Sequence, residues 1–374
     1  MNSIQRLTKG MKRSRHRNIR VLHVGPGYGQ KGGIATVLND LRSKADNLQS
    51  LGIKTAIFPT RSFKSATNIL KFVSTDILRF IHAAWHADIV HLHVASRGSL
   101  VRKGVIFATA KVMRRRCIFH VHSGDFFEYY EGAGAVYRAA AKCMVRHSDA
   151  RVVVSSAHRD DMLKTFGTTS LPTVIGNCAV EAERACLSCA QPIDDGRYVL
   201  FAARLAESKG LEELFRAVRE LRLRGLCVPL KVAGSGDTAR WRGLAETLGI
   251  EDQVEFIGWI VGESKIAAFA RASIFCMPSY FESFGISTLE AMWAGRPVIG
   301  TVVGGFSDLV QEGETGYLVP PRNIPLLAER IGELWSNAAR ANGMGKAGKR
   351  AAQKKFGSAV IIDKYATLYR TVCH

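Results

Sequence analysis

Short β-rich runs alternate with longer segments of helical spacing along this chain, and the alternation occurs twice. Each run is followed by about ten or more residues that can form a helix. The first series has runs at 19–24, 54–58, 88–94, 117–122 and 151–155, and the second has runs at 198–202, 229–233, 254–257, 273–277 and 297–300. Alternation of this kind is typical of parallel sheets built from βαβ units. The sequence therefore predicts two doubly wound α/β domains in tandem.

The length agrees with two domains. The chain has 374 residues, more than the roughly 250 to 300 at which one hydrophobic core stops growing. A loop rich in Pro and Asp at 190–196 separates the two series, so we expect the first domain at 1–190 and the second at 197–357. Hydrophobic residues make up 47% of the chain, which is enough material for two cores.

No segment of the sequence has the pattern of a signal peptide or of a membrane-spanning helix. The N-terminus is basic, but the apolar run after it, VLHVG, is too short. No stretch approaches the roughly 20 apolar residues that span a bilayer. Of the eight cysteines, Cys186 and Cys189 are close together but lack the second pair of ligands that a zinc site needs. We therefore expect a cytoplasmic protein with reduced thiols and no metal.

The charge is unevenly distributed between the two halves. Residues 1–190 hold 29 Lys and Arg against 12 Asp and Glu, a net charge of +17, whereas residues 191–374 hold 23 against 20, a net charge of +3. Basic runs lie at 12–20 and 114–116. Such a field suits anionic lipid, pyrophosphate or nucleic acid, so it identifies a negative partner and no more.

A glycine-rich loop follows the first β-rich run. In open parallel sheets ligands bind at the carboxyl ends of the strands, and the loop at 25–33 leads from such an end into a helix at 34–41. The loop has neither the G-x-G-x-x-G spacing nor the Gly-Lys-Ser/Thr ending of the familiar nucleotide fingerprints. We predict that its backbone amides, Gly33 among them, approach an anion. A structural turn is the alternative.

Two pairs of histidines occur in the third and fourth runs. His122 ends the fourth run just before Ser-Gly-Asp, so we expect it at the tip of a strand, as a hydrogen-bond donor or proton carrier facing the cleft. A structural histidine with a satisfied side chain is the alternative. His91 and His93 lie within the third run and are interpreted as polar core residues. No metal site is expected for these two histidines together with His120 and His122.

Two cations follow the first run of the second series. Arg204 and Lys209 lie across the turn that opens a helix at 211–223. A guanidinium and a mobile ammonium at one helix N-terminus would hold a diphosphate from two sides. A surface salt bridge is the alternative for either residue.

Two glutamates flank another predicted helix start. The run at 273–277 delivers Glu282 into a loop, and Phe284, Gly285 and Ile286 begin a helix that carries Glu290. Free amides and the helix dipole favour a phosphate at this start. Carboxylates on either side of it would accept hydrogen bonds from the hydroxyls of a sugar and a ribose.

These residues together resemble the retaining glycosyltransferases of family 4, which have the GT-B fold of two facing Rossmann-like domains. The resemblance covers nearly the whole chain, and the order of its elements is more specific than any one of them. The matching elements are Gly32-Gly33, His122, Asn177, Arg204, Lys209-Gly210, 233–236, 256–259, Glu282, Glu290, Gly304-Gly305 and 313–319. The sequence departs from the family at 176–180, which replaces a Pro-Asn-Gly turn, and at Asp308, where glutamate is usual.

The resemblance implies a role for each matching site residue. Arg204 and Lys209 would bind the donor diphosphate, Glu282 would meet the transferred sugar, and Glu290 would bind the ribose. His122 would line the transfer site. Backbone groups would serve the phosphates, sugar and base at Gly33, Gly258, Phe284, Gly285 and Ile286. The last helix, at 358–374, would cross back to the first domain, as in the family.

The expected reaction is transfer of a hexose from a nucleoside diphosphate sugar, GDP-mannose or a UDP-hexose, to an acceptor hydroxyl with retention. The chain has no Asp-x-Asp for a divalent ion, so two cations would substitute for the metal, and no cofactor is expected. The acceptor would be a lipid-linked saccharide, reached by docking of the basic first domain on the inner face of the plasma membrane. A sugar-nucleotide epimerase, a phosphorylase and a non-catalytic anion- or nucleic-acid-binding protein are the alternatives, although no basic recognition module supports nucleic acid.

Overall fold

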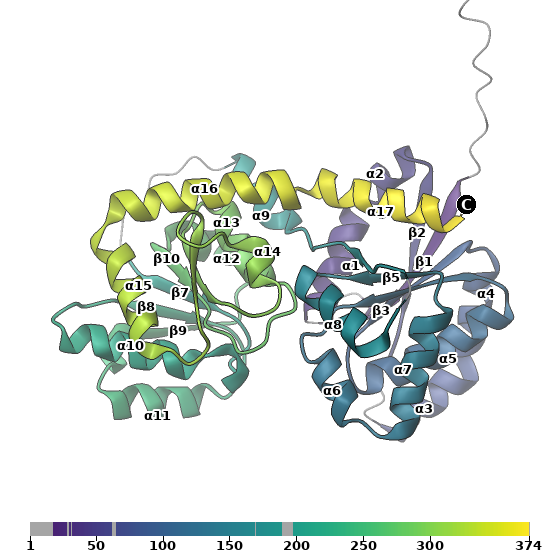
Figure 1. Cartoon of the computed structure of the whole chain (residues 1–374), viewed down its shortest axis with the longest axis horizontal. Coiled ribbons are helices and arrows are strands. Elements are labelled where there is room, and N and C mark those ends of the chain that lie inside the picture. Colours follow the sequence, from purple (N-terminus) through teal and green to yellow (C-terminus); the bar gives the residue numbers. More distant parts are fainter. Residues whose placement is uncertain are drawn as a thin grey trace, which may run out of the picture.

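The computed structural model describes residues 18–27, 30, 32–61, 65–168, 170–188 and 197–373 as two α/β domains joined side by side (Figure 1). The basic segment 1–17, the loop 190–196 and Cys189 lie outside these residues. The first domain has strands β1 (Ile19–Gly25), β2 (Ile53–Pro59), β3 (Ile89–Val94), β4 (Arg116–Val121), β5 (Ala150–Val153) and β6 (Thr173–Val174). Its helices are α1 (Gly33–Ser43), α2 (Ala45–Ser50), α3 (Ala66–Lys71), the π-helical η1 (Phe72–Asp76), α4 (Ile77–Trp85), α5 (Gly98–Val112), α6 (Phe126–Gly132), α7 (Ala135–His147), α8 (Ser156–Phe166) and α9 (Val180–Ser188).

The second domain has the same alternation of parallel strands and helices. Its strands are β7 (Val199–Ala202), β8 (Leu230–Ala233), β9 (Val254–Gly258), β10 (Ile274–Cys276), β11 (Val298–Thr301) and β12 (Gly316–Val319). Its helices are η2 (Glu207–Lys209), α10 (Leu211–Leu223), α11 (Thr238–Leu248), η3 (Glu251–Gln253), α12 (Gly262–Arg271), α13 (Ile286–Trp293), α14 (Phe306–Leu309), α15 (Ile324–Ser336) and α16 (Ala338–Phe356). The chain ends in α17 (Ser358–Cys373).

Both sheets are parallel and doubly wound, as predicted. The strand orders are β2-β1-β3-β4-β5-β6 and β12-β11-β10-β7-β8-β9. Each predicted run is a strand, whereas β6, of two residues, and β12, of four, were not predicted. The chain reverses its winding between β1 and β3 and between β7 and β10, and such switch points are where ligands bind. The predicted site loops follow β1, β4, β7 and β10, so the fold brings them to these edges.

The last helix returns to the first domain. Figure 1 shows α16 and α17 running in succession over both domains. Arg370 of α17 donates to the carbonyl of Leu51 (2.9 Å), and the apolar side chains of α17 join one cluster of buried residues that extends from the second domain into the first. Because α17 follows α16 of the second domain and packs on α2 and β1 of the first, it ties the two domains together. No helix among the described residues is long and apolar enough to cross a membrane.

Candidate active site

A cation and a carboxylate of the predicted site meet directly. Lys209, at the end of η2, lies with its Nζ 2.7 Å from Oε2 of Glu282, and both side chains are largely buried. Arg204, in the loop after β7, is exposed, and its guanidinium has no hydrogen-bond or ion-pair partner among the described residues. Glu282 therefore holds Lys209 in position, while Arg204 is free to bind an anion.

The backbone around Glu282 is fixed by a close approach of two glycines. The N–H of Gly305 donates to the carbonyl of Glu282 (3.1 Å). Gly304 has a φ of 49°, and a Cβ added there would lie 1.7 Å from the same carbonyl oxygen. Only glycine fits this contact. The Gly304-Gly305 pair thus supports the loop that carries Glu282.

The N-terminus of α13 is open to a ligand. Gly285 precedes the helix with a φ of 96°, and no side chain caps the first turn. Its uncapped amides, with the helix dipole, favour an anion. Phe284 is 1% exposed and packs edge-on against Phe356, so only its backbone faces the loop. A Cβ added to Gly33 would lie 4.0 Å from Ile286, so the loop after β1 faces this helix start.

Glu290 lies apart from the Lys209–Glu282 pair, in a second charged cluster. Its Oε1 is 2.9 Å from Nζ of Lys265, which also lies 2.7 Å from Oε2 of Glu181. Burial raises the pKa of Glu290, although Lys265 opposes the shift. Burial also raises the pKa of Asp40 to about 7, with Glu290 among its neighbours. Glu290 is therefore held by Lys265 of α12 and has two further carboxylates nearby, on α9 and α1, and the sequence pattern indicated none of the three.

The remaining predicted residues lie at strand ends. Gly258 ends β9 with a φ of 70°, and its carbonyl accepts from the N–H of Gly234 (2.8 Å). His122 follows β4, is 8% exposed, and its Nε2 lies 2.9 Å from Nδ1 of His93. Burial lowers the pKa of His122 to about 3, so the ring is neutral at physiological pH. A neutral His122 can donate or accept a hydrogen bond but is not a resident cation.

The two domains touch across the cleft. The N–H of Ser156, at the start of α8, donates to Oδ2 of Asp308 (2.6 Å), and the Ser156 hydroxyl donates to Oδ1. A Cβ added to Gly124 would lie 3.2 Å from the backbone nitrogen of Ser283. Asp308, noted only as a departure from the family pattern, thus accepts a hydrogen bond from a free N–H in the first turn of a helix of the opposite domain and connects the two domains.

Comparisons with known proteins agree with this geometry. Residues 2–178 match a family model described as "Glycosyl transferase 4-like domain", and residues 190–351 match one described as "Glycosyl transferases group 1". The chain belongs to the GT4-like glycosyltransferases. The glycogen synthase of Mycobacterium tuberculosis is 25% identical over 291 residues, which are 76% of this chain and 69% of that protein.

Solved glycosyltransferases share the fold of the whole chain. The sucrose-phosphate synthase of Thermosynechococcus elongatus has a TM-score of 0.75 at 21% identity, covering 95% of this chain and 99% of that one. Anabaena HepE, solved in complex with UDP-glucose, has a TM-score of 0.72 at 19% identity, covering 94% of this chain and 100% of that one. The predicted GT-B fold of this glycosyltransferase is confirmed.

Proposed function

We propose that this glycosyltransferase moves a hexose from a nucleoside diphosphate sugar to an acceptor hydroxyl, with retention at the anomeric carbon and without a metal ion. The observation that carries the proposal is the grouping at one sheet edge of an unpaired Arg204, the Lys209–Glu282 pair and an uncapped helix N-terminus. Together they offer two cations and several amides to a diphosphate, and carboxylate oxygens to sugar hydroxyls. The HepE complex with UDP-glucose, which shares the fold, supports this type of donor.

The chemistry follows from where charge develops. As the bond from the anomeric carbon to the diphosphate oxygen breaks, negative charge grows on the leaving group, and Arg204, Lys209 and the amides of α13 would stabilise it. The acceptor oxygen would attack the same face, and its proton would pass to the leaving phosphate oxygen. Because Lys209 contacts Oε2 of Glu282, the other oxygen of that carboxylate is available to a sugar hydroxyl.

A panel of nucleotide sugars tests the proposal. Release of nucleoside diphosphate would be measured for GDP-mannose, UDP-glucose and UDP-N-acetylglucosamine in buffer with excess EDTA. We expect one donor to be consumed in the presence of chelator. Consumption that needs added Mg²⁺ or Mn²⁺ would overturn metal independence, and an inverted product linkage would overturn retention.

The two glutamates are expected to separate sugar recognition from nucleotide binding. Glu282→Gln should depress sugar transfer but leave the affinity for free nucleoside diphosphate nearly intact, because Glu282 would meet only the sugar. Glu290→Gln should weaken both sugar transfer and nucleotide affinity, since a glutamine would lose the charged contacts of the carboxylate with the ribose and with Lys265. Calorimetry with the nucleoside diphosphate, beside turnover, measures the difference. Equal loss of nucleotide affinity in the two variants would contradict the assignment.

For the acceptor, we propose a lipid-linked saccharide at an anionic membrane surface. The support is a stripe of exposed apolar residues, 43% to 66% exposed, along α3, η1 and α4: Ile69, Val73, Leu78 and Trp85. Val73 and Leu78 are five residues apart, and the π-helical turn η1 lies between them. Because the hydrogen bonds of a π-helix join residues five apart, both side chains stay on the same face as the rest of the stripe. Lys71 and Arg79 are exposed on the same helices. Apolar groups with Trp and flanking cations suit a membrane interface.

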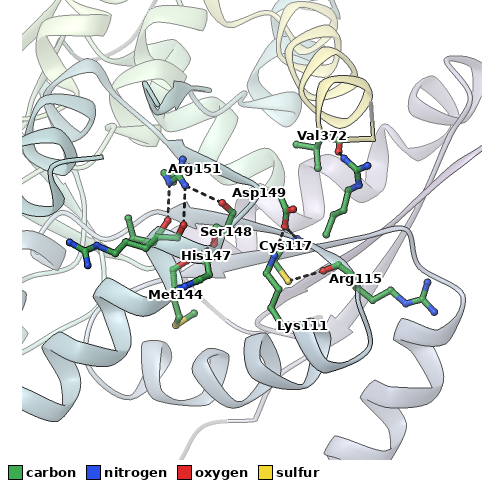
Figure 2. A network of polar contacts seen from close by, with 12 residues as sticks. Lys111, Arg115, Cys117, Met144, His147, Ser148, Asp149, Arg151 and Val372 are labelled. Atoms are coloured by element: carbon green, nitrogen blue, oxygen red, sulfur yellow. Dashed lines mark hydrogen bonds and ion pairs between the residues drawn. The ribbon is translucent and has the colours of Figure 1, made fainter. Parts of the chain in front are cut away.

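Some of the basic residues counted in the sequence are held by contacts within the first domain and with the last helix. Arg115 donates to the carbonyl of Trp85 (3.0 Å), and Arg116 donates to the carbonyl of Val372. Figure 2 shows Lys111 paired with Asp149 in the same region. Two of the three guanidinium groups in the run at 114–116 therefore bond to main-chain carbonyls, which fixes their positions and leaves their charges in place.

The membrane proposal predicts salt-sensitive binding to vesicles. The protein should pellet with anionic phosphatidylserine vesicles at low salt and be released at high salt, since exposed charges are screened within about 8 Å at physiological ionic strength. Leu78→Asp should reduce pelleting several-fold. Leu223→Asp, which changes a leucine 76% exposed on α10 of the second domain, is the matched control and should bind normally. Equal binding to neutral vesicles, or none at low salt, would contradict the proposal.

A further inference from the structure

Five histidines lie against one another inside the first domain. They come from three neighbouring strands and the residue after β4, and α17 covers them with two tyrosines. Adjacent rings have centroids 3.9 to 5.4 Å apart. The rings are His23, His91, His93, His120 and His122, and the tyrosines are Tyr365 and Tyr369. Apart from His122, each ring is at most 1% exposed.

Hydrogen-bond distances connect these rings into one chain through Tyr369. In one arm, Nδ1 of His120 lies 3.1 Å from Nε2 of His91, whose Nδ1 lies 3.0 Å from the Tyr369 hydroxyl. In the other arm, the Tyr369 hydroxyl lies 3.5 Å from Nε2 of His23, and Nδ1 of His23 lies 2.9 Å from Nε2 of His93. Nδ1 of His93 lies 2.9 Å from Nε2 of His122. Three histidines within the chain of contacts have both ring nitrogens at hydrogen-bond distance from a neighbour: His91, His23 and His93.

The hydrogens of this chain can be counted. A neutral imidazole carries one N–H and a tyrosine one O–H, so six groups hold six hydrogens for five contacts. If each contact holds one hydrogen, the sixth lies outside the contacts: on Nε2 of His120, on Nδ1 of His122, or on a Tyr369 hydroxyl that accepts from both of its neighbours. The direction of every bond follows from that choice.

Burial decides among these three arrangements. Tyr369 is fully buried and its hydroxyl has no third partner among the described residues, so a hydroxyl that accepts from both neighbours would leave its own hydrogen without an acceptor. Nε2 of His120 is also fully buried and has no hydrogen-bond partner in the same part of the chain. A buried N–H without an acceptor is rarer and more costly than an unused lone pair. Nδ1 of His122 is not among the buried unpartnered atoms, and His122 lies at the cleft. The hydrogen is therefore favoured at His122.

We propose that the five histidines and Tyr369 form one hydrogen-bonded relay that holds the hydrogen on Nδ1 of every ring, so that His122 presents an N–H donor to the cleft. Tyr369 and His93 are positioning residues in this relay, acting through His122. The inference deepens the proposed function, on which it rests for the acceptor of that N–H, a hydroxyl or phosphate oxygen of the nucleotide sugar. It also gives the C-terminal helix a direct connection to the cleft.

Two further observations favour a relay over a metal centre. Nitrogen atoms of His23, His91 and His93, and of His93, His120 and His122, converge within 4.8 Å. However, the close pairs are at hydrogen-bond distances, and an ion would need lone pairs on both nitrogens of such a pair. An ion would also bring an uncompensated charge among buried neutral rings. Burial lowers the pKa of His23 to about 4, so at neutral pH this ring is uncharged and carries one N–H. Besides burial, which is the largest cause, Lys103 and His158 also lower the pKa of His122.

The tautomers can be read directly. Two-bond ¹H–¹⁵N correlation spectra of the full-length ¹⁵N-labelled protein at pH 7.5 distinguish a protonated Nδ1 from a protonated Nε2. We expect the Nδ1–H pattern for all five buried rings. A mixture of tautomers among them, or Nε2–H throughout, would overturn the relay, as would stoichiometric zinc or copper in the purified protein.

Two matched variants test Tyr369. Tyr369→Phe removes both contacts of the hydroxyl, so the arm of His91 and His120 keeps two hydrogens for one bond, and we expect both rings to show mixed tautomers. Tyr365→Phe is the control, because the Tyr365 hydroxyl is buried, has no partner and lies on the same helix. Its spectrum should match the parent's. Identical spectra for the two variants would overturn the role of Tyr369.

Titration with UDP and GDP separates the relay from the proposed function. If a nucleotide binds, the Nδ1 signal of His122 or the signals of its neighbours in the cleft should shift, with the tautomers unchanged. Uniform Nδ1–H rings without any nucleotide or nucleotide-sugar binding would leave the relay standing and refute the proposed function. Nucleotide binding with mixed tautomers would refute the relay alone.

Discussion

Arg204→Ala and Lys209→Ala are each expected to lower kcat by roughly 30- to 1,000-fold, which corresponds to about 2 to 4 kcal/mol of transition-state stabilisation. Both cations would contact oxygens whose negative charge grows as the sugar leaves, so the loss should appear in kcat rather than only in KM. Arg204→Lys should also be impaired, because an ammonium cannot replace the two-pronged guanidinium. Arg204 is exposed, so its removal should not change the free energy of unfolding.

A control is available on the next helix. Arg216 is an exposed arginine of α10 that pairs with Glu212 four residues earlier (2.8 Å), and such pairs contribute about 0.3 to 0.5 kcal/mol to stability. Arg216→Ala should keep normal turnover. Steady-state rates at saturating donor, with thermal unfolding of each variant, make the comparison. Normal kcat in either site variant would remove that cation from the proposed mechanism.

The sequence predicted the parts of the site that depend on strand ends. Lys209 and Glu282 follow different strands of one parallel sheet, and the carboxyl ends of such strands share an edge, so their contact follows from the βαβ pattern. The surroundings of Glu290 could not be predicted this way. The charged residues around Glu290 lie on three different helices: Lys265 on α12, Glu181 on α9 and Asp40 on α1. Two of these helices, α9 and α1, belong to the first domain, so the approach of the three residues depends on how helices of both domains pack.

The contacts among the buried histidines could not be predicted from the sequence either. Alternation along a strand places His91 with His93, and His120 with His122, on one face, and the sequence predicted that the first two are core residues. The connection between them depends on strand order and on Tyr369, which is 278 residues from its partner His91. The role of Asp308 could not be predicted either, because its partner Ser156 lies at the start of α8 in the other domain.

The buried histidines also determine how the protein should respond to acid. Burial holds the pKa of His23 near 4 and of His122 near 3, and lowers that of His91, His93 and His120 well below the usual 6.5. Each ring therefore stays neutral in the folded protein while it gains a proton in the unfolded chain below pH 6.5. The unfolded state binds more protons in this window, so stability is present above pH 6.5 and is lost as pH falls toward 4.

Acidification from pH 7.5 to 5.5 is expected to remove roughly 8 kcal/mol of unfolding free energy, about 1.4 kcal/mol from each of the five rings and from His158, whose pKa burial lowers to about 4. Lys103 adds about 1 kcal/mol to this loss, because burial lowers its pKa to about 7 and the folded protein binds fewer protons there than the unfolded chain until the pH falls below that value. Asp40 opposes the loss, because burial raises its pKa to about 7, and it returns about 2 kcal/mol. The net loss, roughly 7 kcal/mol, is comparable to the total stability of an ordinary domain, about 5 to 15 kcal/mol. Urea unfolding at several pH values measures it, and His82→Ala, which changes an exposed histidine of α4, should leave the profile unchanged. A protein as stable at pH 5.5 as at pH 7.5 would mean that the rings ionise within the fold, which is incompatible with a relay of neutral imidazoles.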